Sequence, residues 1–254
     1  TQMYTIITFL KDIVNYTGTL FPQVLEGLKV TMEIFLLTLI LSIPLGVLVA
    51  LGRLSKIKII NKLTGFYVLI MRGTPLLLQI VFIFFGLPNL NIVIDRFPAA
   101  IIAFTLNYAA YFGEIFRAGI SSVDIGQNEA SQVLGLSKKD TFFRIILPQA
   151  FKTILPPIAN EIVTLVKDTA LVYVIGIDEL LRVGKIACNR DSSLLPLLII
   201  GIVYLILIKK NLQYNYGVLQ TPHVLSDLPN FYTILCIYPF LHFSIQSKTC
   251  INLL

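Results

Sequence analysis

The sequence predicts an all-α integral membrane protein with five transmembrane helices, and three observations support this fold class. Of the 254 residues, 56% are hydrophobic and only 13% are charged, against roughly 45–50% and about 25% in soluble domains. Several apolar stretches approach the ~20 residues that a helix needs to cross a bilayer. Lys and Arg lie mainly between those stretches, and not on one soluble face as in a nucleic-acid-binding protein. A water-soluble protein and a nucleic-acid partner are therefore not expected.

Five segments are expected to span the membrane as helices, since lipid leaves every backbone polar group to be satisfied within the segment. They run from Leu28 to Leu51, Leu63 to Leu87, Phe97 to Phe116, Thr153 to Gly176, and Leu194 to Ile208, the last being short. The stretch from Phe21 to Thr31 carries Glu26 and Lys29 and is expected to lead in along the membrane surface. Residues 1–210 therefore form one transmembrane domain, and residues 211–254 form a tail expected to be disordered or interfacial.

The basic residues indicate the orientation of the spans, because cytoplasmic connections collect Lys and Arg. One alternating set of connections contains eleven of these residues, and the other set contains six. The N-terminus is therefore expected outside the cell, and the long loop from Arg117 to Lys152 is expected inside. The net charge of +6 follows chiefly from this topology.

The cysteines and histidines predict neither a disulfide framework nor a metal site. Cys188, Cys236 and Cys250 show no paired or metal-binding spacing. The two histidines lie far apart near the end of the sequence. No bound metal is expected in this chain.

The cytoplasmic loop carries the most informative pattern of the sequence. Residues 128–134 are expected to form a short helix that closes at Gly135, because glycine readily adopts the left-handed conformation. Ser137 is expected to cap a second helix, whose start the Asp140 carboxylate favours, and this helix is expected to end near Pro148. The pattern alone also fits an amphipathic loop that rests on lipid headgroups.

The same loop resembles a known family. Glu129-Ala130, Gly135 and Ile146-Leu147-Pro148 resemble the cytoplasmic EAA loop of permease subunits from binding-protein-dependent ABC importers, although Ser131 replaces the usual second alanine. Three further motifs resemble the polar amino acid branch of that family, which includes permeases of the histidine, glutamine and arginine type. These motifs are Arg72-Gly-Thr-Pro-Leu-Leu-Leu-Gln79, Ala109-Ala-Tyr111 with Glu114 and Arg117, and Lys167-Asp-Thr169 followed by Ala170, where a serine is common.

The resemblance implies a type I ABC importer permease fold, also called MetI-like, in the inner (plasma) membrane of a bacterium. In that family two permease subunits, identical or related, form the pathway, and an extracytoplasmic binding protein delivers the amino acid. Two ATPase subunits drive the cycle, and a coupling helix in the loop, here about residues 124–150, seats in a cleft of the ATPase. The residues that the resemblance implies for this coupling are Gly126, Glu129, Ala130, Ser131, Leu134, Gly135 and Leu136.

ATP is expected to bind to a different polypeptide. The sequence contains no G-x-x-x-x-G-K-[ST] phosphate-binding loop. ATP and Mg²⁺ must therefore be bound by the partner ATPase subunit if ATP drives the process. No cofactor and no enzymatic activity are expected for this chain itself.

An interruption of the second apolar stretch is a candidate substrate site. Pro75 lacks the amide that would bond the carbonyl of Met71, and Thr74 is expected to cap a new helical segment that begins at Pro75. A substrate α-carboxylate could bind Arg72 and the backbone amides freed at the break. The alternative is a simple proline kink in which Arg72 pairs with a neighbouring carboxylate.

The predicted fourth span carries a polar face. Glu161 and Asp168 are seven residues apart and lie on nearly the same side of a helix, with Thr164 between them. Charged residues within a bilayer are costly, so each one is a candidate functional residue. Two carboxylates would favour a cationic substrate such as arginine, lysine or histidine. Because Lys167-Asp168-Thr169 also matches a family-wide pattern, the resemblance implies a structural or gating role for Asp168, and we expect Glu161 and Asn160 to contact the substrate.

The third span and the segment before the break complete the candidate site. Asn107 and Tyr111 share one face of the third span, whereas Glu114 and Arg117 are expected to form a local ion pair. The candidate substrate-binding residues are Tyr67, Met71, Arg72, Gly73, Thr74, Asn107, Asn160, Glu161 and Asp168.

The function that the resemblance implies is that of a membrane-spanning subunit in an ATP-driven importer of polar L-amino acids, with the cationic ones arginine, lysine and histidine as candidates. Two alternatives remain open. An ATP-independent secondary transporter or channel would use the same buried charges for ion coupling. An intramembrane enzyme could use Glu161 and Asp168 as a catalytic pair, although the sequence has no H-E-x-x-H motif.

Overall fold

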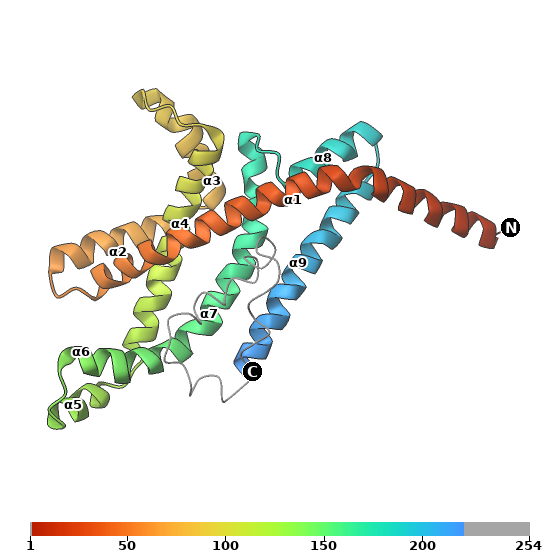
Figure 1. Ribbon diagram of the computed structural model, residues 1–254. Helices are drawn as coiled ribbons and strands as arrows, with labels where there is room; N and C mark the ends of the chain where they lie inside the picture. The colour runs from red at the N-terminus through yellow and green to blue at the C-terminus, as the bar shows by residue number, and fades with distance from the viewer. Residues whose placement is uncertain (1, 221–254) are drawn as a thin grey trace, which may run out of the picture. The chain divides into compact units, whose positions relative to one another are not determined.

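The computed structural model describes the backbone of residues 2–220 and the side chains of residues 16–209, and every regular element in this part of the chain is helical (Figure 1). The predicted all-α class is therefore confirmed. Residues 1–208 form one compact unit, which contains all the candidate residues, and residues 209–254 form a second unit. Most of the predicted tail, from residue 221 onward, lies outside the described residues.

The first predicted span lies within one long helix, α1 (Gln2–Leu54). The stretch from Phe21 to Thr31, expected as a separate lead-in along the membrane surface, is part of this same uninterrupted helix. Pro22 and Pro44 both lie inside it, which is tolerated in spanning helices because neighbouring groups can satisfy the freed carbonyls. The apolar part, from Tyr16 to Leu54, is long enough to cross a membrane.

Helix α4 (Arg96–Ser121) contains the third predicted span and packs closely against α1. A Cβ atom on Gly113 would lie 2.6 Å from Val49 Cγ1 and 3.2 Å from the Gly46 carbonyl oxygen. A Cβ atom on Gly46 would lie 2.8 Å from Phe112 Cβ. Small residues allow close helix contacts in membranes, where packing replaces the hydrophobic effect as a driving force for helix association. The two glycines therefore set the distance between α1 and α4.

The second predicted span, Leu63 to Leu87, is bent and not straight. Helix α2 (Lys58–Gly73) ends at the predicted break, and α3 (Leu76–Val81) begins beyond it. The π-helical turns of η1 (Phe82–Gly86) and the 3-10 turn η2 (Leu87–Leu90) continue α3. The helix path bends by 103° between the two arms (Figure 1). The predicted break is therefore confirmed. The bend at this break is larger than a simple proline kink would produce.

The long loop between residues 117 and 152, predicted to be cytoplasmic, contains the two predicted helices with different bounds. Helix α5 (Ile125–Val133) begins three residues earlier than predicted, because Asp124 caps it by accepting a hydrogen bond from the Gly126 amide at 2.6 Å. Gly135 adopts the left-handed conformation with φ of 73°, as predicted. Ser137 caps α6 (Lys138–Asp140), as predicted, by accepting from the Asp140 amide at 3.1 Å.

The prediction that the second loop helix ends near Pro148 is wrong. The chain remains helical through the π-helical turns of η3 (Thr141–Ile146) and on into α7 (Leu147–Asp168). Pro148 lies in the first turn of α7, directly after the π-helical turns. In the first turn of a helix a backbone amide needs no helical acceptor, so the missing amide of Pro148 is tolerated there.

The fourth and fifth predicted spans correspond to α7, followed by the 3-10 helix η4 (Thr169–Ile175), and to α9 (Leu195–Gln220). Helix α8 (Leu180–Asp191) lies between them. By length and apolar composition, the described helices that could cross a membrane are α1 and α4, with the bent α2–α3 pair as a third and the apolar part of α9, Leu195–Lys209, falling short in length. Helix α7 is long enough but not apolar enough to be among them, because polar residues interrupt its apolar face.

Candidate functional site

The break in the second span has an extended backbone at two successive residues. Thr74 has φ and ψ of −117° and 146°, and Pro75 has −61° and 134°. The Thr74 hydroxyl donates back to the carbonyl of Ile70 at 2.8 Å. The prediction that Thr74 caps the next helix is therefore wrong: α3 begins at Leu76 without a side-chain cap, because the Thr74 hydroxyl already serves the preceding helix.

Two amide side chains satisfy the backbone at the break. The Gln79 side-chain nitrogen donates to the Met71 carbonyl at 3.0 Å and to the Thr74 hydroxyl at 2.8 Å. The Asn107 side-chain nitrogen, from α4, donates to the same Met71 carbonyl at 2.8 Å and to Gln79 Oε1 at 3.0 Å. An open carbonyl in hydrocarbon is costly. Asn107, predicted to contact substrate, is thus engaged in holding the break.

Gln79 was not singled out as a site residue, although the sequence holds a signal for it. It is the one amide within the apolar run from Leu76 to Phe85. A polar side chain in such a run needs a partner within the protein. The Met71 carbonyl, which Pro75 leaves without its helical donor, is that partner.

Tyr67 and Met71 pack against their own helical neighbours. Both lie on the apolar cluster of Val49, Val68 and Ala110. The Tyr67 hydroxyl donates a hydrogen bond to the carbonyl of Leu106 in α4. Their contacts are those of packing residues between α1, α2 and α4.

Arg72 brings a positive charge to the end of α2. Its guanidinium carbon lies 5.0 Å from the centroid of the Tyr111 ring, a cation–π geometry. It also interacts electrostatically with the carboxylates of Glu114 on α4 and Glu161 on α7. The ion pairs formed within residues 16–209 do not include Arg72, so the alternative of a kink held by a direct Arg72–carboxylate pair is not observed there. Gly73 is exposed beside it.

The polar face of α7 is divided between two kinds of environment. Asp168 accepts a hydrogen bond at 2.8 Å from the hydroxyl of Tyr108, a buried residue of α4, which supports the structural role expected for it. Thr164 donates to the Asn160 carbonyl at 3.0 Å within the helix. Glu161 is half-buried, and Asn160 is exposed. Of the two carboxylates of α7, Glu161 is the one on which the charge of Arg72 acts.

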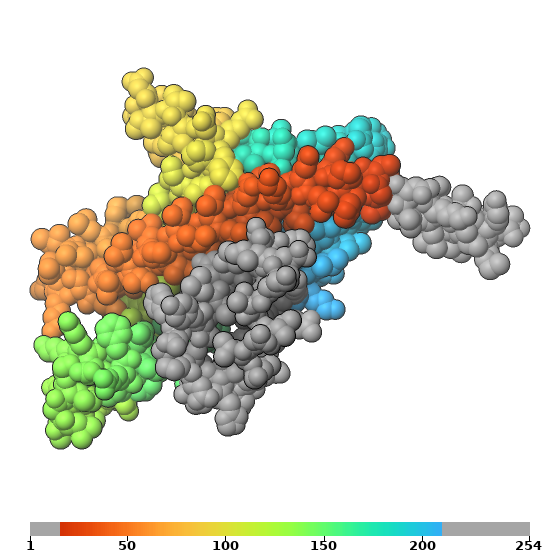
Figure 2. Space-filling view, in the orientation of Figure 1, coloured from red at the N-terminus to blue at the C-terminus, as the bar shows by residue number. Residues whose placement is uncertain are grey.

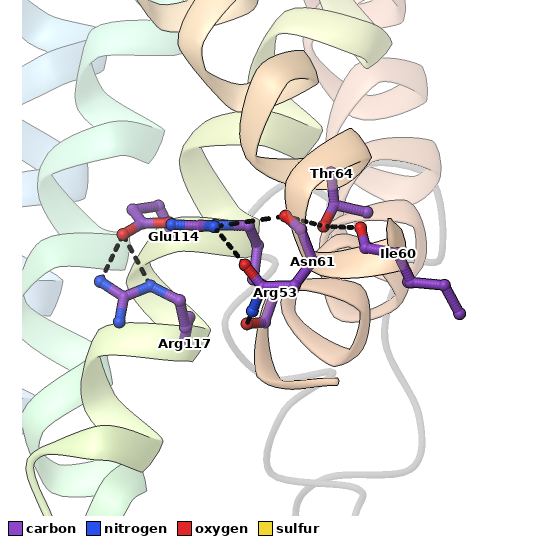
Figure 3. Close-up of polar contacts among 6 residues, drawn as sticks. All are labelled: Arg53, Ile60, Asn61, Thr64, Glu114 and Arg117. Carbon is purple, nitrogen blue, oxygen red and sulfur yellow. Dashed lines mark hydrogen bonds and ion pairs between the residues drawn. The ribbon is translucent and has the colours of Figure 1, made fainter. Parts of the chain in front are cut away.

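A second charge cluster lies where α1, α2 and α4 meet (Figure 3). The predicted ion pair of Glu114 and Arg117 is confirmed, with Arg117 Nε 2.7 Å from Glu114 Oε1. Arg53, at the end of α1, joins it at 3.6 Å from Glu114 Oε2 and also donates to Asn61 Oδ1 of α2 at 3.1 Å. The sequence did not predict this extension, because Arg53 and Glu114 are far apart along the chain.

The residues predicted for coupling to an ATPase are mostly on the surface of the loop, which appears green in Figure 2. Gly126, Glu129, Ala130 and Gly135 are exposed. Apolar side chains are exposed beside them, namely Ile125 at 72%, Val133 at 89%, Leu134 at 74% and Leu136 at 36%. The loop thus presents an apolar surface around α5, which is consistent with both the coupling and the interfacial interpretations.

Ser131 is the exception among those residues, because it is buried. Its hydroxyl donates to the Asn128 carbonyl at 2.7 Å and accepts from the Thr141 hydroxyl at 3.0 Å. The serine in place of a second alanine therefore joins α5 to the start of η3 within the loop, and does not face outward.

A buried carboxylate lies outside the predicted spans, where no sequence pattern marks it. Glu179 is completely buried and caps α8 by accepting from the amides of Leu181 at 2.6 Å and Arg182 at 2.7 Å. Tyr204 of α9 donates to it at 3.2 Å. Burial raises the pKa of the Glu179 carboxyl, against the lowering effect of these hydrogen bonds.

Comparisons with known proteins agree with this arrangement. The arginine transport system permease protein ArtQ of Bacillus subtilis (strain 168) is 41% identical over 74% of this chain and 86% of that protein. The L-cystine transport system permease protein TcyB of the same organism is 39% identical over 73% of this chain and 80% of its own length. The putative glutamine transport system permease protein GlnP of Rickettsia prowazekii (strain Madrid E) is 37% identical over 74% and 88%.

Solved structures share the fold. A crystal structure of an amino acid ABC transporter with histidines matches at a TM-score of 0.75 and 34% identity, covering 82% of this chain and 96% of that chain. An inward-facing structure of the MetNI methionine ABC transporter matches at a TM-score of 0.63 and 18% identity, covering 78% and 95%, which supports the type I importer permease fold alone. Residues 42–209 match the family model described as binding-protein-dependent transport system inner membrane component. The resemblance seen in the loop and the break is thereby confirmed, and the chain belongs to this family of ABC importer permeases.

Proposed function

We propose that this permease subunit imports polar L-amino acids with a preference for cationic ones, and that ATP bound by a separate ATPase drives the import. The similar proteins carry names for arginine, cystine and glutamine transport, so the names alone support amino acids and not one side-chain class. The observation that carries the cationic preference is the half-buried Glu161 carboxylate of α7, on which the charge of Arg72 acts.

The pair of charges matches the two ends of an amino acid. The Arg72 guanidinium at the end of α2 suits an α-carboxylate, since Arg binds carboxylates with two parallel hydrogen bonds. Glu161 on α7 suits the ammonium or guanidinium of a cationic side chain. The two groups come from different helices, and Arg72 lies at the break of a discontinuous helix, where transporters commonly place substrate. Asp168 already accepts a hydrogen bond from Tyr108, so it contributes less to selectivity in this proposal.

The loop supports coupling to an ATPase subunit. Its exposed apolar residues, Ile125, Val133 and Leu134, surround the helix that carries Glu129. A short capped helix with an apolar surface and a left-handed glycine exit suits a cleft in a partner protein. In our proposal two such loops seat on two ATPase subunits, and the permease works as a homodimer or as a heterodimer with a related chain. A binding protein delivers substrate on the outer side, where the N-terminus lies.

The test is reconstitution of the complex, with ATPase and binding protein, into lipid vesicles. Uptake of arginine and glutamine is measured with and without ATP. We expect ATP-dependent uptake of both, and a larger loss for arginine than for glutamine in Glu161→Gln. Glu33→Gln, the same chemical change at an exposed site on α1, serves as the control and leaves the ratio of the two uptakes unchanged.

Two outcomes would contradict the proposal in different ways. Equal losses of arginine and glutamine uptake in Glu161→Gln would remove the cationic preference. Uptake that persists without ATP when an ion gradient is supplied would favour a secondary transporter over an ATP-driven importer.

A further inference from the structure

The charge cluster of Arg53, Asn61, Glu114 and Arg117 is not explained by substrate binding or by the coupling surface. It joins three helices that are separate in sequence (Figure 3). We infer that Glu114, through Arg53, is a positioning residue that ties the turn between α1 and α2 to α4, the helix that leads into the cytoplasmic loop. This inference rests on the proposed transport function.

The first step is that Arg53 closes the turn between α1 and α2. Its guanidinium donates to Asn61 Oδ1 at 3.1 Å, and the Asn61 side-chain nitrogen donates to the Arg53 carbonyl. A Cβ atom on Gly65 would lie 2.8 Å from Arg53 Nη1. The turn of residues 55–57 is thus bridged by a reciprocal pair, and a glycine leaves the space that the guanidinium fills. The side chain of Arg53 is therefore fixed against α2 by Asn61 and by the space at Gly65.

The second step is that Glu114 connects the Arg53–Asn61 pair to α4. Its Oε1 accepts from Arg117 on the same helix, and its Oε2 faces Arg53 Nε at 3.6 Å. Both Glu114 Oε2 and Arg53 Nε are buried without a hydrogen-bond partner among the described residues. Charges in a low-dielectric setting attract strongly, and loss of one leaves the other uncompensated. The Arg53–Glu114 contact is thus the electrostatic link between the two helices at this end.

The third step is the position of the link along the helices. Glu114 lies about two helical turns before the end of α4 at Ser121, which is ~10 Å along the axis. The cap of α5, Asp124, follows directly. At the other end of α2 stands Arg72, whose charge also acts on Glu114. A displacement of the loop that moves the end of α4 therefore moves the α1–α2 turn, and through α2 the substrate break.

The experiment measures this link directly with spin labels at two exposed positions, Lys58 on α2 and Ala118 on α4. The full complex is labelled in lipid vesicles, with the native cysteines replaced by serine. We expect a narrow distance distribution in the parent protein and a broad one in Glu114→Gln, which keeps the side-chain shape and removes the charge. Arg117→Gln is the matched control, because Arg117 contacts Glu114 within α4 only, and it keeps the narrow distribution.

A functional readout accompanies the distances. We expect Glu114→Gln to retain assembly and ATP hydrolysis but to lower the uptake per ATP hydrolysed roughly tenfold, within the usual range for coupling between sites. Arg53→Gln should do the same, and the double variant should be no worse than either single variant. A purely structural role would instead lower assembly, hydrolysis and uptake together.

The outcomes separate this inference from the proposed function. An unchanged label distribution in Glu114→Gln, or equal broadening in Arg117→Gln, would overturn the positioning role. Additive losses in the double variant would also overturn it, because they would show that the two residues act independently. A parent complex that hydrolyses ATP without taking up any amino acid would contradict the proposed function alone, since the label distances would still decide the inference.

Discussion

Replacement of Gly113 by alanine tests the close packing of α1 against α4. The new Cβ atom would lie 2.6 Å from Val49 Cγ1, 2.8 Å from Val49 Cβ and 3.2 Å from the Gly46 carbonyl oxygen, whereas ordinary contacts begin at 3.4 Å. Val49 cannot turn away easily, because a β-branched side chain has one strongly preferred rotamer in a helix. The helices must therefore separate.

The size of the effect follows from two opposing contributions. Overpacking of this kind costs about 1–3 kcal/mol, while alanine in place of glycine within a helix gains about 1 kcal/mol. Gly201→Ala in α9 is the matched control, because nothing lies within 4 Å of its Cβ position. The propensity gain is common to both variants, so the difference between their free energies of unfolding isolates the steric cost of about 1–3 kcal/mol.

The assay is reversible unfolding of the purified chain in mixed detergent, followed by circular dichroism. We expect Gly113→Ala to be less stable than Gly201→Ala by that amount. Adding Val49→Ala to Gly113→Ala should restore only part of the loss, because the Cβ atom at position 49 remains. Equal stability of the two glycine variants would refute the reasoning that the glycines set the distance between the helices.

Two further predictions concern polar side chains that satisfy backbone groups. Gln79→Leu should destabilise the chain by about 1–3 kcal/mol in the same assay, since it removes a donor from the Met71 carbonyl and the Thr74 hydroxyl; a neutral result would show that Asn107 alone satisfies the break. The pKa of Glu179 is raised in the folded protein above its ordinary value of 4.5. Between these two pKa values the folded state binds more protons than the unfolded state, so the free energy of unfolding should fall as the pH rises from 4.5. In Glu179→Gln that decline should be smaller, and an identical pH profile would contradict the assignment.

Local signals in the sequence were reliable where one residue decides the backbone. Gly135 and Ser137 close and open the loop helices as their chemistry predicts. Pro75 likewise breaks the second span, because a missing amide cannot be replaced within the same helix. Pro148 does not end the second loop helix as expected, because the π-helical turns that precede it leave no mark in the sequence periodicity.

Signals that depend on distant residues could not be found in this way. The donors for the Met71 carbonyl come from α3 and α4, and only the fold shows that Asn107 and Gln79 reach the same atom. Arg53 read as a topology signal until α1 and α4 were brought together. Glu179 lies outside the predicted spans, and no local pattern marks it as the completely buried cap of α8.

The amide bridge at the break has a consequence for an empty transporter. Gln79 and Asn107 supply hydrogen bonds from within the protein to backbone groups that a broken helix would otherwise leave to water or substrate. These hydrogen bonds do not depend on a ligand, so in the proposed function the break is already shaped before substrate arrives. Binding free energy is then not spent on ordering this part of the wall.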